Sequence, residues 1–177
     1  MTGYFSLWEQ YGGQMLAAFW GNLQLAFYAA IASLLLGLVL ALMRISPVAS
    51  FRLVASAYVN IIRNTPLTII ITFGVAVLYG VFTWQLSGDF NLNFFRIAIV
   101  GLSIYHAAFF CEAIRSGVNT VPIGQAEAAR AIGLGFFAAA RNIILPQALR
   151  GAITPIGNTL IALIKNTTVV AAGSVIE

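Results

Sequence analysis

The stretch TVPIGQAEAARAIGLGFFAAARNIILP (Thr120–Pro146) is the one long polar and charged interval in a chain otherwise made of apolar runs. Pro122 suits the first turn of a helix, and the alanine-rich sequence after it favours a helix over Gln125–Ile132. Gly133 and Gly135 are expected to end that helix, because glycine readily adopts the conformations found at helix ends. This half of the stretch therefore predicts a short helix followed by a glycine turn.

The other half predicts a second short helix, Phe136–Leu145, with Pro146 as its end. Two short helices between membrane spans are typical of a docking surface. The plain alternative is a solvated helix with one ion pair between Glu127 and Arg130, which contributes only about 0.3–0.5 kcal/mol.

Composition places the chain in a membrane. The 177 residues are 60% hydrophobic and 8% charged, and the mean hydropathy is +0.93, whereas roughly a quarter of the residues in soluble domains are charged. A soluble fold of this size could not cover so much apolar surface, so we expect an all-α transmembrane domain. The net charge of +4 does not indicate nucleic-acid binding, because the basic residues are sparse and lie in loops.

A single domain, 1–177, is predicted with four spans at about 15–43, 66–84, 97–115 and 152–176, and a loop at about 116–150. Phe51–Ile62 is either a surface helix or the bent start of the second span, with a break at Thr65–Pro66. One side of this topology carries only Arg96, and the other carries seven arginines: Arg44, Arg52, Arg63, Arg115, Arg130, Arg141 and Arg150. The positive-inside rule then predicts a cytoplasmic loop and an N-terminus outside the cell.

The fourth span is unusually polar and is expected to be interrupted. Lys165 at mid-membrane costs about 2.5–3.5 kcal/mol, which the Ile, Leu and Val residues offset at about 0.3–0.6 kcal/mol each. Such a span is stable only against other helices or beside a water-filled path. Lys165 could meet the carboxylate of a cargo, pair with a residue such as Glu112, or extend to the membrane interface.

The chain lacks the residues for catalysis. Lys165 is the only lysine and is not preceded by a phosphate-binding glycine loop, and motifs for zinc proteases and serine hydrolases are absent. His106 is the only histidine and could act as a proton relay or form an interhelical hydrogen bond. We therefore expect a chain that is not an enzyme and binds no metal or cofactor.

A resemblance adds to this interpretation. Glu127-Ala128-Ala129, followed by Gly133, Leu145 and Pro146, resembles the EAA loop of bacterial ABC-importer permeases. The segments FCEAIRSGV, GQAEAARAIGLG, IILPQALR and GNTLIALIKNTT are similar to the polar amino acid branch of that family. The resemblance implies a permease whose family has a further span after Glu177.

The resemblance also implies roles for individual residues. It implies ATPase coupling for Gly124, Gln125, Glu127, Ala128, Ala129, Gly133, Leu145 and Pro146. It suggests a substrate path with Lys165, Asn166, Thr167, Thr168, Asn158, Arg63 and Thr65. Glu112 and Arg115, three residues apart, are expected to form a helix-end ion pair, to which the family match adds a coupling role.

The partners implied by the resemblance are a cytoplasmic ATPase dimer, which uses ATP and Mg²⁺, a second permease subunit and an extracytoplasmic binding protein. The cargo implied is a polar amino acid, with Asn64 and Asn166 resembling the glutamate and aspartate subgroup. An ion-coupled secondary transporter and a purely structural membrane subunit remain as alternatives. The first needs inverted repeats, and the second needs no polar residues in its spans.

Overall fold

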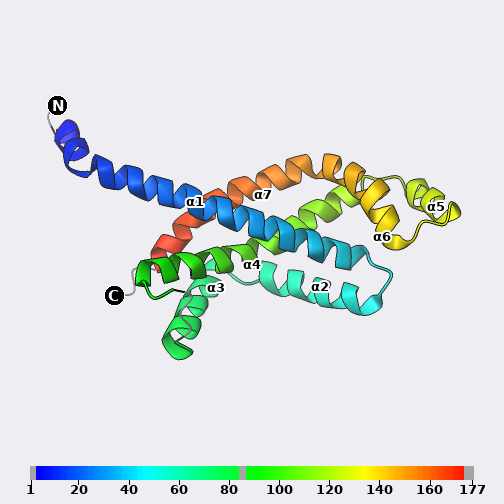
Figure 1. Cartoon of the computed structure of the whole chain (residues 1–177), viewed down its shortest axis with the longest axis horizontal. Helices are drawn as coiled ribbons and strands as arrows, with labels where there is room; N and C mark the ends of the chain where they lie inside the picture. Colours follow the sequence, from blue (N-terminus) through cyan, green and yellow to red (C-terminus); the bar gives the residue numbers. More distant parts are fainter. Residues whose placement is uncertain (1–2, 84–86, 174–177) are drawn as a thin grey trace.

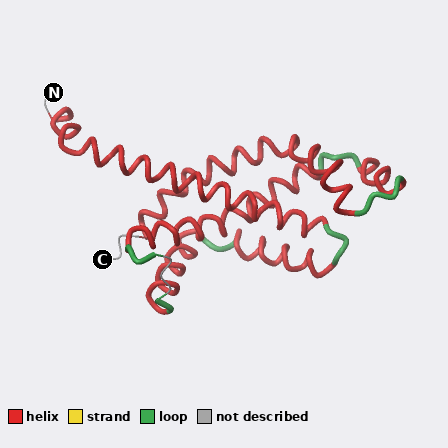
Figure 2. Tube along the Cα trace, in the orientation of Figure 1, coloured by secondary structure: helices red, strands yellow, loops and turns green. Residues whose placement is uncertain are grey.

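The computed structural model describes residues 3–83 and 87–173, which form helices joined by short turns, with no strand in these ranges (Figures 1 and 2). This confirms the predicted all-α class. The first helix, α1 (Gly3–Ile45), extends past the rest of the bundle at its N-terminal end (Figure 1). Its segment Trp8–Ile45 is long and apolar enough to cross a membrane.

The next helix, α2 (Ala49–Arg63), turns back along α1. One face of α2 packs against α1 and α4, with Ala55 and Val59 fully buried, whereas most of its other residues are exposed. The helix ends at Arg63, and the helical segment that follows, Leu67–Val77, is bent by 98° relative to α2. Proline at position 66 explains this break, because it cannot continue a helix hydrogen-bond ladder.

The second predicted span is irregular. It consists of α3 (Leu67–Phe73) and the wider π-helix η1 (Gly74–Val81). The prediction that this span reaches Trp84 falls on a residue outside the described ranges.

The central helix is α4 (Phe90–Val118), which begins where the Asp89 carboxylate accepts a hydrogen bond from the Leu92 amide at 2.9 Å. It packs against α1 on one side and α7 (Leu145–Gly173) on the other. Phe110 and Ile114 of α4 are fully buried there.

Glycine allows these helices to approach closely. A Cβ atom added at Gly37 of α1 would lie 2.6 Å from the Cβ of Phe110. A Cβ atom added at Gly117 of α4 would lie 2.1 Å from the carbonyl oxygen of Ala148 in α7. Small residues at such crossings are the usual means of helix association in membranes.

Residues 120–144, which we call the elbow, lie at the end of the molecule opposite the N-terminus (Figure 1). The elbow contains α5 (Ile123–Ala131), α6 (Phe136–Ala139) and the π-helix η2 (Ala140–Ile144). The predicted helix, glycine turn and helix are present.

The helix end predicted at Pro146 is wrong, because η2 runs directly into α7. The interruption expected in the fourth span is also not present, since α7 is one helix that continues through Pro155. A proline ring normally clashes with the carbonyl four residues before it, and the wider π-turn directly before Pro146 relieves that clash. Inside a membrane helix, neighbouring groups can compensate for the hydrogen bond that proline removes.

By length and composition, two of the described helices can cross a membrane: Trp8–Ile45 and Asn91–Val118. The bent pair formed by α2 and α3 adds a third if it counts as one span. The predicted fourth span corresponds to α7, which is long enough but is not among these candidates. The polar residues of α7 are the physical reason why its composition does not mark it as a membrane span.

Candidate functional site

A groove with polar side chains lies between α4 and α7. It has a cavity volume of about 290 Å³. Its lining residues are Tyr105, His106, Phe109, Asn158, Thr159, Ala162 and Asn166. On α7 the positions 158, 159, 162 and 166 follow helical spacing, so they share one face of the helix. A volume of this size suits a small polar molecule.

The groove is held together by a hydrogen bond between the two helices. Nδ1 of the buried His106 ring lies 3.0 Å from the carbonyl oxygen of Leu102, and the Asn166 amide lies 3.1 Å from Nε2. A neutral ring that donates through Nδ1 and accepts at Nε2 satisfies both contacts. Of the two roles expected for His106, the structure contains the interhelical hydrogen bond.

The predicted substrate-path residues do not form one cluster. Asn158 and Asn166 line the groove, whereas Thr167 and Thr168 line a different cavity of about 350 Å³ with residues of α1 and α4. Their hydroxyl groups donate to backbone carbonyls within α7, at 2.6 and 2.7 Å. Thr65 lines a third, apolar cavity beside α3 and α4.

Lys165 is exposed, and it makes no ion pair with any residue in the described parts of the chain. The expected alternative of a pair with Glu112 is therefore not what the structure contains. Lys165 is also not among the residues that line the groove, although its neighbour Asn166 is.

Glu112 of α4 forms ion pairs with three arginines from three helices: Arg44 of α1, Arg63 of α2 and Arg115 of α4. Arg44 donates a hydrogen bond to Oε1, and Arg115 donates to Oε2 at 3.2 and 3.3 Å. The predicted pair of Glu112 and Arg115 is thus part of a larger cluster. We call these four residues the arginine cluster.

Arg63 is the loosest member of the arginine cluster. Its Nη1 atom lies 3.8 Å from Oε1 of Glu112, and its side chain is 46% exposed. Its guanidinium carbon stands 5.7 Å from the centre of the Phe109 ring, which lines the groove. This cation–π contact places a positive charge next to the groove.

The elbow presents a mixed surface. Gln125, Glu127 and Ala128 are exposed, whereas Ala129 is fully buried. Gly133 has a φ of +80°, in the left-handed region that favours glycine, which explains why α5 ends there. The other predicted coupling residues are exposed at Gly124 and Pro146 and half-buried at Leu145.

The expected ion pair within α5 is not formed. Arg130 donates instead to the backbone carbonyl of Ala126 at 3.3 Å. Three large apolar side chains are exposed on the elbow and were not predicted: Ile123 at 77%, Ile132 at 74% and Phe137 at 78%. Exposed apolar groups near charged ones mark protein interaction sites.

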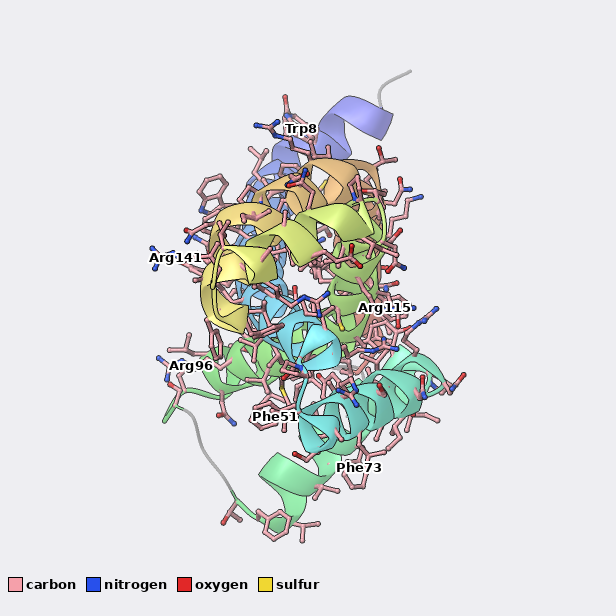
Figure 3. All side chains as sticks on the ribbon, turned by 90° about the vertical axis from the view of Figure 1, so that its right-hand side faces the viewer. Trp8, Phe51, Phe73, Arg96, Arg115 and Arg141 are labelled. Carbon is pink, nitrogen blue, oxygen red and sulfur yellow. The ribbon has the colours of Figure 1, made fainter. Side chains whose placement is uncertain are left out.

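The elbow also meets the end of α1. A hollow of about 350 Å³ is lined by Ile45 and Pro47 on one side and by elbow residues that include Arg130 and Phe136 on the other. Arg141, also in the elbow, and Arg115 project away from the bundle on opposite sides in Figure 3. The elbow thus borders the end of α1 at this hollow, and its last helix, η2, continues directly into α7.

Sequence reasoning missed Tyr105, Phe109, Thr159 and Ala162 of the groove, and it placed Arg44 only in the topology. The helical spacing of polar residues on α7 is the signal that could have found part of the groove. No signal joins residues 44, 63 and 112, because they are far apart in the sequence.

Comparison with a family model matches residues 33–172 to the binding-protein-dependent transport system inner membrane component family. The glutamate transport system permease protein GluC of Corynebacterium efficiens is 50% identical over 169 residues, which cover 93% of this chain and 74% of the relative. The probable glutamine ABC transporter permease protein GlnM of Bacillus subtilis is 39% identical, with 85% of this chain and 67% of the relative covered.

Solved structures give the same result. A crystal structure of an amino acid ABC transporter with histidines matches with a TM-score of 0.68 at 32% identity, covering 85% of this chain and 67% of that one. An inward-facing structure of the MetNI methionine ABC transporter matches with a TM-score of 0.69 at 25% identity, covering 82% and 68%.

Proposed function

Because the chain belongs to the family of binding-protein-dependent transport system inner membrane components, we propose that it is the permease subunit of an ATP-driven amino acid importer that carries glutamate. The resemblance noted in the sequence is confirmed, and the chain is a transport component of the membrane. Glutamate is proposed because relatives with 50% and 47% identity are named as glutamate transport permeases.

One observation carries the mechanism. The chain is helical without interruption from Phe136 through η2 and α7 to Gly173, since Ala140 and Leu145 keep right-handed helical dihedral angles. The same continuous helix begins in the elbow and carries Asn158 and Asn166 in the groove. A displacement of the elbow is therefore transmitted to one wall of the groove.

In this proposal the elbow faces the cytoplasm and α5 enters a groove on a separate ATPase, which binds ATP and Mg²⁺. Support comes from the exposed surface formed by Gln125, Glu127, Ala128 and the large apolar side chains of Ile123 and Ile132. This chain binds no cofactor itself.

Two permease subunits, identical or paralogous, pair with two ATPase subunits, and an extracytoplasmic binding protein delivers the cargo. The N-terminus of α1 faces outwards in this arrangement, at the end of the molecule opposite the elbow. The arginines near the ends of α1, α4 and α5 support this orientation through the positive-inside rule.

A cysteine introduced at Gly124 should then react with maleimide only after the inner face of the membrane becomes accessible.

The deciding experiment is reconstitution of the permease complex, with its ATPase and binding protein, in proteoliposomes. We expect ATP-dependent uptake of labelled glutamate. Glu127→Lys and Gly133→Glu should abolish the coupling of ATP hydrolysis to uptake while the spans stay folded. Glu9→Lys, which reverses an exposed charge on α1 far from the elbow, is the matched control and should transport normally.

Three results would reject the proposal. Uptake driven by an ion gradient without the ATPase would favour a secondary transporter. Normal coupled transport by both elbow variants would show that α5 is not the coupling surface, and an absence of any uptake by a complete complex would favour a structural subunit.

A further inference from the structure

Among the residues that the structure describes, those that line the groove between α4 and α7 include no charged side chain. His106 accepts a hydrogen bond at Nε2 and is in direct contact with Asn166, so the polar groups that line the groove are neutral. An amino acid with an extra carboxylate brings a net negative charge into this space. A charge that leaves water needs a partner of opposite sign.

Arg63 is the cation placed to supply that partner. Its guanidinium lies 5.7 Å from the centre of the Phe109 ring, and that ring forms part of the groove. With 46% of its side chain exposed and 3.8 Å between Nη1 and the Glu112 carboxylate, Arg63 is held less tightly than a hydrogen-bonded arginine.

The charges of the arginine cluster also favour Arg63 as the partner of a cargo carboxylate. Glu112 has one negative charge, and Arg44 and Arg115 already donate hydrogen bonds to its two oxygens. Arg63 is therefore a surplus cation that Glu112 does not need. Arginine is also well suited to a carboxylate, because its planar group can donate two parallel hydrogen bonds.

We propose that Arg63 binds the extra carboxylate of an acidic amino acid in the groove and thereby makes the permease itself selective for anionic cargo. This inference rests on the proposed function, since it requires an amino acid to enter the groove. On binding, the guanidinium exchanges its loose contact with Glu112 for the cargo carboxylate, while Arg44 and Arg115 keep Glu112 neutralised.

Lys165 is the rival cation. It precedes Asn166 on α7, but successive residues of a helix point about 100° apart. Neither Lys165 nor Arg63 lines the groove itself, but the Arg63 guanidinium lies over the ring of Phe109, which does. The structure thus favours Arg63, and the two residues can be separated by experiment.

The test measures binding by the reconstituted complex of permease and ATPase, without the binding protein and without ATP. Labelled glutamate is displaced by unlabelled glutamate or glutamine, which differ mainly by one charge. We expect the wild type to prefer glutamate by about tenfold or more, the effect of one hydrogen bond between charged groups. Arg63→Gln should remove this preference, and Arg63→Lys should retain most of it.

Arg52→Gln is the matched control, because Arg52 is an exposed arginine of the same helix, α2, whose guanidinium donates to the carbonyls of Ser46 and Pro47 and belongs neither to the arginine cluster nor to the groove lining. It should keep the preference. A retained preference in Arg63→Gln, or its loss in Lys165→Met instead, would overturn the inference. The proposed function fails separately, through absence of ATP-dependent glutamate uptake by the wild type in the transport assay.

Discussion

Gly37 and Gly117 in the helical bundle serve a different purpose from Gly133 in the elbow. At Gly37 and Gly117 a neighbouring helix occupies the space that a side chain would need. At Gly133 and Gly135, an added Cβ would meet no atom within 4 Å from the described residues beyond its chain neighbours, and the φ of +80° at position 133 favours glycine. Gly37 and Gly117 thus allow close packing in the bundle, and Gly133 allows a special backbone conformation in the elbow.

This difference separates two kinds of constraint on one chain. In the bundle, residues are fixed by volume and charge pairing with neighbouring helices, so most substitutions should affect stability. In the elbow, side chains such as Glu127 and Phe137 are exposed, so substitutions should affect the fit to a partner instead. The predictions below test that separation.

The largest effect on stability is expected for Glu112→Gln. The substitution leaves Arg44 and Arg115 without their carboxylate, and loss of one partner of a partly buried charge cluster destabilises by about 3 kcal/mol. Thermal unfolding of the purified protein in nanodiscs should show a large decrease in melting temperature.

Glu127→Gln is the control for this prediction, because it removes the same charge from the exposed elbow. It should leave the melting temperature nearly unchanged. Equal melting temperatures for Glu112→Gln and Glu127→Gln would contradict the division between bundle and elbow.

Gly117→Ala should have the next largest effect. The added methyl group meets the Ala148 carbonyl oxygen at 2.1 Å and the Ala152 Cβ at 2.7 Å, so α4 and α7 must separate. Overpacking of this kind typically destabilises by about 1–3 kcal/mol. Gly157→Ala in α7 meets nothing within 4 Å and should be neutral or slightly stabilising.

The measurement is the yield and melting temperature of monodisperse protein after extraction from the membrane. If Gly117→Ala is as stable as Gly157→Ala, the close approach of α4 and α7 is not a constraint on the folded protein.

Gly133→Ala should have a smaller and more local effect. A non-glycine residue in the left-handed region costs about 1–2 kcal/mol, and relief of this strain would change how α5 ends. We expect normal melting of the bundle but weaker stimulation of ATP hydrolysis in the complex. Gly135→Ala, at a φ of −66°, is the matched control and should retain the stimulation.

Local features of the fold were predictable from the sequence because their causes are local. Pro122 and Gly133 mark the two ends of α5, and Thr65–Pro66 marks the break after α2. The break expected at Pro146 was wrong because η2 widens the helix directly before it, and the proline is accommodated. The continuity of this helix matters for function, since it joins the elbow to the groove.

The candidate site was less predictable because it depends on contacts between distant segments. Asn158 and Asn166 were correctly placed on one helix, but Tyr105 and Phe109, which line the same groove from α4, are apolar in pattern and resemble any other core residues. The arginine cluster joins three helices. Positive-inside topology predicts that such arginines share a side, but not that they share one carboxylate.

The smallest effect is expected for the hydrogen bond between His106 and Asn166, which joins α4 and α7 inside the bundle. Interhelical hydrogen bonds in membrane proteins contribute only about 0.6 kcal/mol on average, because the unfolded protein in the membrane also finds partners. A double-mutant cycle with His106→Ala and Asn166→Ala should give a coupling free energy of unfolding of about this size. A coupling well above 2 kcal/mol would show that polar contacts, rather than close packing at glycine, hold α4 to α7. In that case the contrast between bundle and elbow would be one of buried and exposed polar groups, and the groove would be more rigid than its packing implies.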